Sequence, residues 1–183
     1  QSYTITTGTK LVELEDAVGN ETTVYIDAKA PTTERAYKKQ GGVATIVDAR
    51  ETADADNNNT AASGLWKITE YNGSSESGNI DLIEQATGVV ENKMKVFNLS
   101  NSNVNQIYVY DKAGNKRLVS LSNDNAGPVV TGPTYSGGTI TLNAIDNESG
   151  LATVKETDTS NSETEIANYT NPAGSLYYPQ GQI

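Results

Sequence analysis

The sequence contains no cysteine and no histidine. Without cysteine, the chain has no disulfides, no thiolate metal sites and no cysteine nucleophile. Without histidine, it lacks the usual general base of a serine or cysteine triad and the commonest zinc ligand. No nucleophile elbow or phosphate-binding loop is present, and no carboxylate pair stands out among the 23 acidic residues. We therefore expect a protein that is not an enzyme.

Basic residues are scarce, because 13 Lys and Arg face 23 Asp and Glu and give a net charge of −10. Nucleic-acid binding needs basic surface to neutralise phosphates, so nucleic acid is not an expected partner. The same argument disfavours an anionic membrane surface, and no apolar run approaches the ~20 residues that span a bilayer. This acidic, cysteine-free profile is common among extracellular proteins of Gram-positive bacteria, although many cytosolic proteins share it.

Large aromatic residues other than tyrosine are nearly absent, with one Trp, one Phe and ten Tyr. With a hydrophobic content of 36 %, the chain has material for a core of modest size. Ser, Thr, Asn, Asp and Gly are abundant, as is typical of short strands joined by many turns. The composition therefore favours an all-β protein.

Two stretches of the chain repeat one pattern, "DAVGNETTVYID" from Asp16 and "DKAGNKRLVSLS" from Asp111. Apolar residues recur at the same offsets before and after the aspartate with a period of two, which indicates strands with one buried face. The Gly-Asn pair between them tolerates positive φ, and the aspartate can accept backbone N–H bonds within a turn. Each copy therefore predicts a β-hairpin. The matched apolar positions are Val12 and Ile107, Leu14 and Val109, Val24 and Val119, and Ile26 and Leu121.

A second repeated block reads "SGLWKITE" from Ser63 and "SGLATVKE" from Ser149, each preceded by an alternating strand, "VATIVDA" or "TITLNAID". Ser63 precedes Asp111 by 48 residues. The path from Ser149 to the last residue and on from the first residue to Asp16 amounts to 50 residues. The two ends of the chain therefore have the lengths of complementary parts of one unit.

These spacings divide the chain into three segments. Residues 1–29 resemble the final hairpin of a unit, residues 30–127 a complete unit, and residues 128–183 the first strands of another. The chain is then either a window on a longer array or a subunit whose head completes the tail of the next molecule.

The acidic loop with Ser-Gly-Leu (Asp146 to Leu151), the Asp-x-Ala-Gly-Asn turn (Asp111 to Asn115) and a proline-containing linker resemble the immunoglobulin-like repeats of bacterial surface proteins. Val18 departs from that pattern, and the middle unit carries an insertion, "ETADADNNNTAAS". The resemblance implies tandem antiparallel β-sandwiches of about seven strands each, located outside the cell at its surface.

The resemblance also implies a non-catalytic spacer, such as a stalk, an adhesin shaft or a surface-layer element, whose partners are neighbouring units. Two alternatives remain open. One is a carbohydrate- or ligand-binding module, in which Trp66 stacks on a host or cell-wall glycan rather than filling the core. The other is a subunit of a head-to-tail filament or surface layer.

Two segments carry oxygen ligands that suit Ca²⁺. In the insertion, Asp54, Asp56 and Asn58 alternate, although the glycine and the glutamate of an EF-hand loop are missing and a solvated loop has the same composition. The linker "SNDNAGP" is similar to the calcium-binding linker of cadherins, but Gly127 interrupts the motif and an ordinary polar turn fits equally. The candidate ligands of this second site are Asn123, Asp124, Asn125, Asp146 and Glu148.

Overall fold

The computed structural model describes residues 2–4, 11–52, 62–82, 90–168 and 180–182. These residues form fifteen strands and no helix, which confirms the predicted all-β class. In chain order the strands are β1 (Leu11–Glu15), β2 (Glu21–Tyr25), β3 (Thr32–Lys39), β4 (Ala44–Thr52), β5 (Leu65–Tyr71), β6 (Glu76–Asp81), β7 (Val90–Asn98), β8 (Gln106–Asp111), β9 (Lys116–Ser120), β10 (Ser122–Asp124), β11 (Val129–Ser136), β12 (Thr139–Ile145), β13 (Thr153–Thr157), β14 (Glu163–Asn168) and β15 (Gln180–Gln182). Within the described ranges, no helix is present that could cross a membrane.

Both predicted hairpins are confirmed: β1 pairs antiparallel with β2, and β8 pairs antiparallel with β9. Their turns have the same backbone hydrogen bonds, since Gly19 N donates to Asp16 O at 3.1 Å and Gly114 N donates to Asp111 O at 3.2 Å. The two glycines take φ angles of 87° and 89°, a region that favours glycine because side chains with a Cβ are strained there.

The asparagine of each turn contributes through hydrogen bonds rather than through its backbone conformation. Among the described residues, positive φ is adopted by the glycine of each Gly-Asn pair but not by its asparagine. Instead, the Asn20 backbone and side-chain amides donate to the Asp16 carboxylate at 2.9 and 2.6 Å, and Asn115 donates to Asp111 in the same way at 2.8 and 2.9 Å. The expected role of the two aspartates as acceptors within the turn is confirmed.

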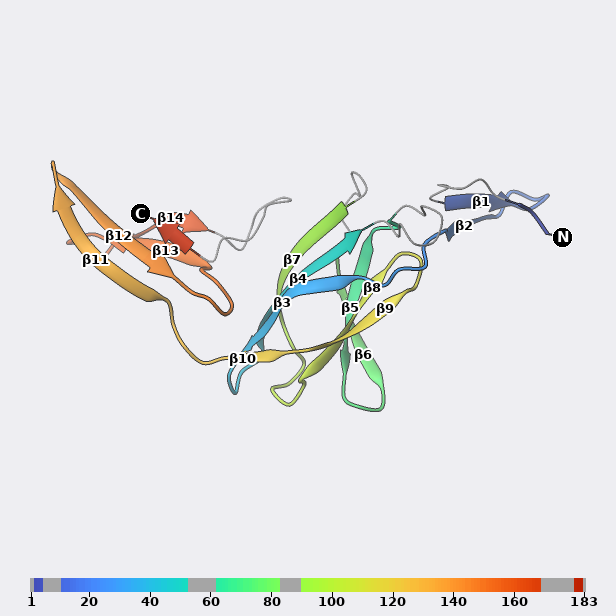
Figure 1. The fold of residues 1–183 in the computed structure, drawn as a ribbon, viewed down its shortest axis with the longest axis horizontal. Helices are drawn as coiled ribbons and strands as arrows, with labels where there is room; N and C mark the ends of the chain where they lie inside the picture. The colour runs from blue at the N-terminus through green and yellow to red at the C-terminus, as the bar shows by residue number, and fades with distance from the viewer. Residues whose placement is uncertain (1, 5–10, 53–61, 83–89, 169–179, 183) are drawn as a thin grey trace.

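The middle strands, β3 to β10, form two four-stranded sheets (Figure 1). One sheet has the order β10-β3-β4-β7 and the other β6-β5-β8-β9, and all neighbours are antiparallel except β10 and β3, which run parallel. One hydrophobic cluster takes residues from strands of both sheets and from their connections: Val47, Ala49, Leu65, Ile68, Leu82, Leu99, Val104, Ile107, Val109, Val119 and Leu121.

Alternation along the strands explains which residues enter this cluster. On β4, Val47 and Ala49 are buried at a period of two, and on β8 Ile107 and Val109 are buried in the same way. Two residues further along each strand, the next inward-facing position is also buried. It is Glu51 on β4 and Asp111 on β8. Two acidic side chains are thereby buried at the ends of strands from different sheets.

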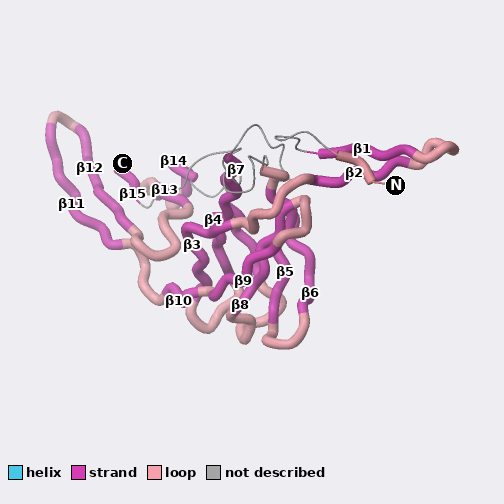
Figure 2. Tube along the Cα trace, turned by 45° about the vertical axis from the view of Figure 1, so that its right-hand side comes forward, coloured by secondary structure: helices cyan, strands magenta, loops and turns pink. Residues whose placement is uncertain are grey.

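The N-terminal hairpin (β1 and β2) and the C-terminal strands (β11 to β15) lie on opposite sides of the middle strands (Figure 2). The hairpin pairs with no other described strand, and the C-terminal strands form the sheets β11-β12-β15 and β13-β14. Burial therefore differs between repeated positions. Leu14 is 48 % exposed and Val24 is 42 % exposed, whereas their counterparts Val109 and Val119 are 0 % and 7 % exposed.

Candidate functional site

Three carboxylates converge where the N-terminal hairpin joins the middle strands. Asp27 follows β2, Glu51 lies near the end of β4, and Asp111 ends β8. One carboxylate oxygen of each lies within 4.8 Å of the other two. Glu51 and Asp111 are buried, and Asp27 is half-buried. We call these three residues the first acidic cluster.

Ser63 connects two members of this cluster. Its backbone N–H donates to both Asp27 Oδ2 and Glu51 Oε1 at 2.9 Å, and its hydroxyl donates to Glu51 Oε1 at 3.1 Å. The Ser63 hydroxyl oxygen in turn accepts the Ala113 backbone N–H at 3.2 Å. All donors to Glu51 thus approach one of its two oxygens, and Oε2 is buried without a hydrogen-bond partner.

The close approach of the acids changes their ionisation. Burial, a hydrogen bond with Asp27 and the charge of Asp111 raise the pKa of Glu51 to about 8. Burial raises the pKa of Asp111 to about 6, although hydrogen bonds from Asn115 act in the opposite direction. Burial also acts to raise the pKa of Asp27, but its hydrogen bonds, first that with Glu51, hold this pKa below its usual value. As an acid, Glu51 shares its proton with Asp27; as a carboxylate, its Oε2 faces no donor.

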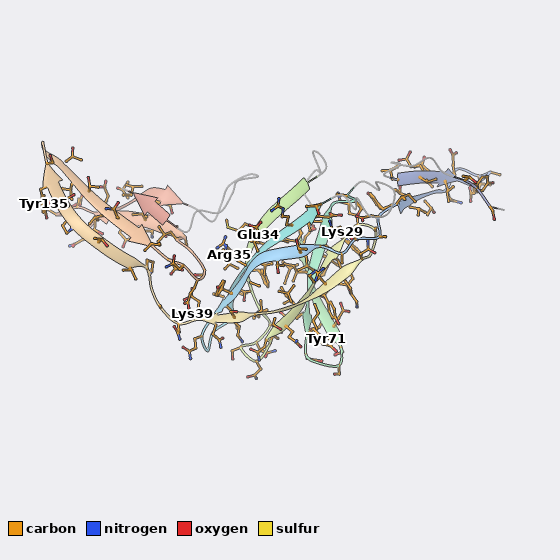
Figure 3. All side chains as sticks on the ribbon, in the orientation of Figure 1. Lys29, Glu34, Arg35, Lys39, Tyr71 and Tyr135 are labelled. Atoms are coloured by element: carbon orange, nitrogen blue, oxygen red, sulfur yellow. The ribbon has the colours of Figure 1, made fainter. Side chains whose placement is uncertain are left out.

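The linker that carries Asp27 is fastened to several segments of the middle strands. Asp27 Oδ1 accepts the Lys29 backbone N–H at 2.9 Å, and the Asp27 carbonyl accepts Asn115 Nδ2 at 3.0 Å. Lys29 Nζ donates to Thr52 Oγ1 at 2.8 Å, and Figure 3 shows Lys29 at the end of the middle strands nearest the N-terminal hairpin. Arg117 Nε donates to the carbonyl of the buried Pro31 at 2.6 Å. The linker is therefore part of the folded structure of the middle strands.

A second group of acids lies where the middle strands lead into the C-terminal strands, and we call Asp124, Asp146 and Glu148 the second acidic cluster. Hydrogen bonding with Asp124, followed by burial and the Asp124 charge, raises the pKa of Glu148, and the Asp146 charge adds to this effect. Asp146 Oδ1 accepts the backbone N–H groups of Glu148 at 3.0 Å and Gly150 at 2.8 Å. As in the first cluster, one buried glutamate oxygen, Glu148 Oε2, has no donor when the carboxyl group is ionised.

The two linkers use the same hydrogen bonds. Asp27 accepts the backbone N–H of Ser63 through Oδ2, and Asp124 accepts the backbone N–H of Ser149 through Oδ2 at 3.3 Å. Through Oδ1, each aspartate also accepts the N–H of the residue two positions further on, which is Lys29 in one linker and Ala126 in the other. A linker aspartate is thus joined to the serine of each Ser-Gly-Leu block.

The second linker has one further tie. Arg35 on β3 donates from Nη1 to the carbonyl of Ser149 at 2.7 Å and forms an ion pair with Asp48 at 3.4 Å. Figure 3 shows Arg35 on the side of the middle strands that faces the C-terminal strands. A cavity of about 600 Å³ lies beside this contact and includes Ile46 and Leu151 in its wall. The C-terminal strands therefore contact the middle strands but leave space between them.

The structure brings some of the predicted metal ligands together and leaves others apart. Asp124 and Asp146 both act on Glu148, but among the described residues the only three acids with ligand oxygens all within 4.8 Å of one another are those of the first cluster. Asn123 and Asn125 are exposed, and Asn125 contributes a backbone hydrogen bond to Glu148. The remaining three predicted ligands, Asp54, Asp56 and Asn58, lie outside the described residues.

Sequence reasoning missed the first acidic cluster as a site. It treated Asp111 as a turn residue and did not consider Asp27 or Glu51 as ligands. A usable signal was present, because Glu51 and Asp111 continue the inward-facing, period-two rows of their strands. A charged residue at an inward position indicates a buried polar site.

Trp66 lies on β5, is exposed, and belongs to a row of aromatic rings rather than to the hydrophobic cluster. Its ring centroid is 6.2 Å from that of Tyr110, which is 6.4 Å from that of Tyr108. Lys67 Nζ lies 4.0 Å from the Trp66 ring centroid, and Lys116 Nζ lies 4.2 Å from that of Tyr108. Lys67 and Lys116 therefore each make a cation–π contact with an aromatic ring that a sugar would otherwise use for stacking.

No family model, curated protein or solved structure matches this chain. The two linkers and their acidic clusters are the features of the chain from which a function can be inferred.

Proposed function

We propose that this chain is a non-catalytic spacer module of an extracellular bacterial surface protein, built from tandem immunoglobulin-like β-sandwiches. The observation that carries the proposal is the repeated fastening of a linker aspartate to a Ser-Gly-Leu block, Asp27 to Ser63 and Asp124 to Ser149. A linker that is hydrogen-bonded to the following unit restricts the angle between units. A fixed angle is what a stalk or a lattice element requires.

The sandwich architecture is supported by the middle strands. Their two four-stranded sheets contribute to one hydrophobic cluster, as two sheets packed face to face would do. The parallel β10-β3 pair beside otherwise antiparallel neighbours, together with the β8-β9 hairpin at its Asp-x-Ala-Gly-Asn turn, fits the predicted unit of residues 30–127.

The spacer proposal is tested by measuring the spread of distances between units. Because the chain contains no cysteine, introduced cysteines are unique sites for spin labels. One exposed pair, Val18→Cys with Ser77→Cys, spans the first linker, and another, Ser77→Cys with Tyr135→Cys, spans the second. Pulsed electron–electron double resonance should give a narrow distance distribution for each pair of spin labels.

Removing the linker carboxylates should widen these distributions. We expect at least a twofold increase in width for Asp27→Ala at the first linker and for Asp124→Ala at the second. Asp158→Ala is the matched control, because Asp158 also accepts backbone N–H bonds but lies in the β13-β14 turn. Broad distributions in the unsubstituted chain, or unchanged widths in both linker variants, would contradict the proposal.

Exposed apolar positions favour a second candidate function, a subunit that assembles head to tail. Leu14 and Val24 occupy the positions that are buried in the β8-β9 hairpin, yet both are exposed. The C-terminal strands expose apolar side chains of their own, which are Val129, Val130, Tyr135, Ile140 and Ile166. A hairpin from one copy seated on the C-terminal strands of another would cover both surfaces.

Sedimentation velocity over a concentration series tests this assembly. The sedimentation coefficient should increase with concentration in the unsubstituted chain and stay constant when Leu14→Ser and Val24→Ser are combined. Val18→Ser is the control, because Val18 is exposed at the tip of the same hairpin and is not one of the matched apolar positions. A concentration-independent monomer in the unsubstituted chain would rule out this candidate.

A further inference from the structure

The first acidic cluster has an unmet bonding requirement at Glu51. This residue is 1 % exposed, and when it is ionised its Oε2 is buried without a hydrogen-bond donor. Burying an ionised oxygen without a partner is strongly unfavourable, so a charged Glu51 requires a positive species at this position. Two other carboxylates lie within 4.8 Å, so the position is surrounded by oxygen ligands.

We propose that the first acidic cluster binds one Ca²⁺ ion through carboxylate oxygens of Asp27, Glu51 and Asp111. The site does not depend on the proposed spacer function, because its ligands are defined by the buried ends of β4 and β8 and by the start of the linker.

The neighbouring groups do not neutralise the three carboxylates. The hydrogen bonds to them from Ser63, the Lys29 backbone and Asn115 are all made by neutral donors. Two basic side chains are tied to the linker, Lys29 through Thr52 Oγ1 and Arg117 through the Pro31 carbonyl. A divalent cation bound by the ionised carboxylates compensates their charge directly.

The donor set and its spacing favour calcium. Carboxylate oxygens are hard ligands that suit Ca²⁺ and Mg²⁺, and a chain without Cys or His offers no soft or imidazole ligand. One oxygen from each acid lies within 4.8 Å of the others, which is within reach of a single Ca²⁺ ion with Ca–O lengths of about 2.3–2.6 Å. Mg²⁺ demands near-ideal octahedral geometry and gives up its bound waters reluctantly, so a buried set of three protein carboxylates suits Ca²⁺ better.

A repeated feature supports the same chemistry. In the second acidic cluster, Glu148 Oε2 is also buried without a partner, beside Asp124. Both glutamates lie beside a linker aspartate that accepts the backbone N–H of a Ser-Gly-Leu serine, although Glu51 comes from a strand and Glu148 from the loop directly before Ser149.

Isothermal titration of CaCl₂ into the chelator-treated full chain tests the proposal. We expect binding with a dissociation constant of about 10⁻⁴–10⁻³ M, the range of extracellular calcium modules, and an increase in melting temperature at saturating calcium. Mg²⁺ at the same concentration should bind at least tenfold more weakly. No heat and no thermal shift with calcium, or equal binding of the two ions, would overturn the assignment.

Glu51→Gln keeps the size of the side chain and removes its charge, so it should weaken the site at least tenfold. Glu148→Gln, at the glutamate of the second cluster, should leave the first site unchanged. Asp27→Asn is a second variant of the first site for the case in which Glu51→Gln does not fold. Calcium binding that is unaffected in the folded variants of the first site would refute the proposal.

The outcomes for the ion and for the spacer are separable. The label-distance measurement in chelator depends on the Asp27 to Ser63 hydrogen bond and not on the ion. Narrow distance distributions without calcium binding would support the spacer proposal and reject the calcium site. Calcium binding with broad distance distributions would support the calcium site and reject the spacer proposal.

Discussion

Replacing Lys38 by methionine should strongly destabilise the middle strands. Lys38 lies on β3 and is buried, and its Nζ donates to the carbonyls of Ser102 at 2.8 Å and Val104 at 2.9 Å. These carbonyls belong to the segment that leads into β8. The amine therefore joins β3 of one sheet to the segment that precedes a strand of the other sheet. Methionine has a similar length and no donor, so Lys38→Met removes both hydrogen bonds.

The expected loss follows from these two contacts. A hydrogen bond to a charged group contributes about 1.5–3 kcal/mol, so two contribute about 3–6 kcal/mol. Part of this is offset because the variant no longer buries an ammonium group, and we expect a net loss of about 3 kcal/mol in the free energy of unfolding. With a urea dependence of about 1.5 kcal/mol per molar, the unfolding midpoint should fall by about 2 M.

Urea unfolding followed by tryptophan fluorescence measures this shift directly. Trp66 is the single tryptophan and lies on β5, so the signal reports on the middle strands. Lys39→Met is the matched control, because Lys39 is the exposed neighbour on the same strand, and its midpoint should change little. A Lys38→Met midpoint within about 0.5 M of the control would refute the assigned role of the buried amine.

Three further predictions concern other parts of the chain. Ile107→Ala should cost about 2–5 kcal/mol in urea unfolding, whereas Leu14→Ala, on the exposed hairpin, should leave that transition within about 0.5 kcal/mol. Burial of Glu76 acts to raise its pKa, but hydrogen bonds, first that from Lys116, lower the pKa to about 2. Glu76 therefore stabilises the fold above its ordinary pKa of 4.5, and the difference in melting temperature from Glu76→Gln should disappear as the pH falls from 4.5 towards 2. A glycan array should show no binding that Trp66→Ala abolishes, because Lys67 already stacks on the indole; loss of a glycan signal in that variant would contradict this.

The sequence was informative where the determinants are local. The period-two rows and the Asp-x-x-Gly-Asn motif predicted both hairpins and the role of Asp16 and Asp111, because a turn depends on residues four or fewer positions apart. The same turn recurs at Asp158, where Asn161 adopts a φ of 62° in place of glycine. Asparagine tolerates this conformation, so a motif defined on glycine did not find it.

The first acidic cluster is a different case, because it depends on contacts between distant parts of the chain. Asp27, Glu51 and Asp111 come from a linker and from strands of two sheets, and no spacing in one sequence relates them. The exposure of the side chains on the N-terminal hairpin could not be predicted from the sequence either. The pattern of Leu14 and Val24 matches that of buried residues, and whether other strands cover them is decided by packing rather than by the pattern.

The parallel pairing of β10 with β3 has a mechanical consequence. The chain enters the middle strands at the start of β3 and leaves them after β10, where Ser122, Asn123 and Asp124 pair with Tyr37, Lys38 and Lys39. When the two ends are pulled apart, these parallel strands slide past each other along their length. Their hydrogen bonds, with that of Gln40 N to Asp124 O at 2.8 Å, then resist together instead of opening one after another. The exit of the middle strands is thus a shear clamp, whereas an antiparallel hairpin pulled from its open end would unzip.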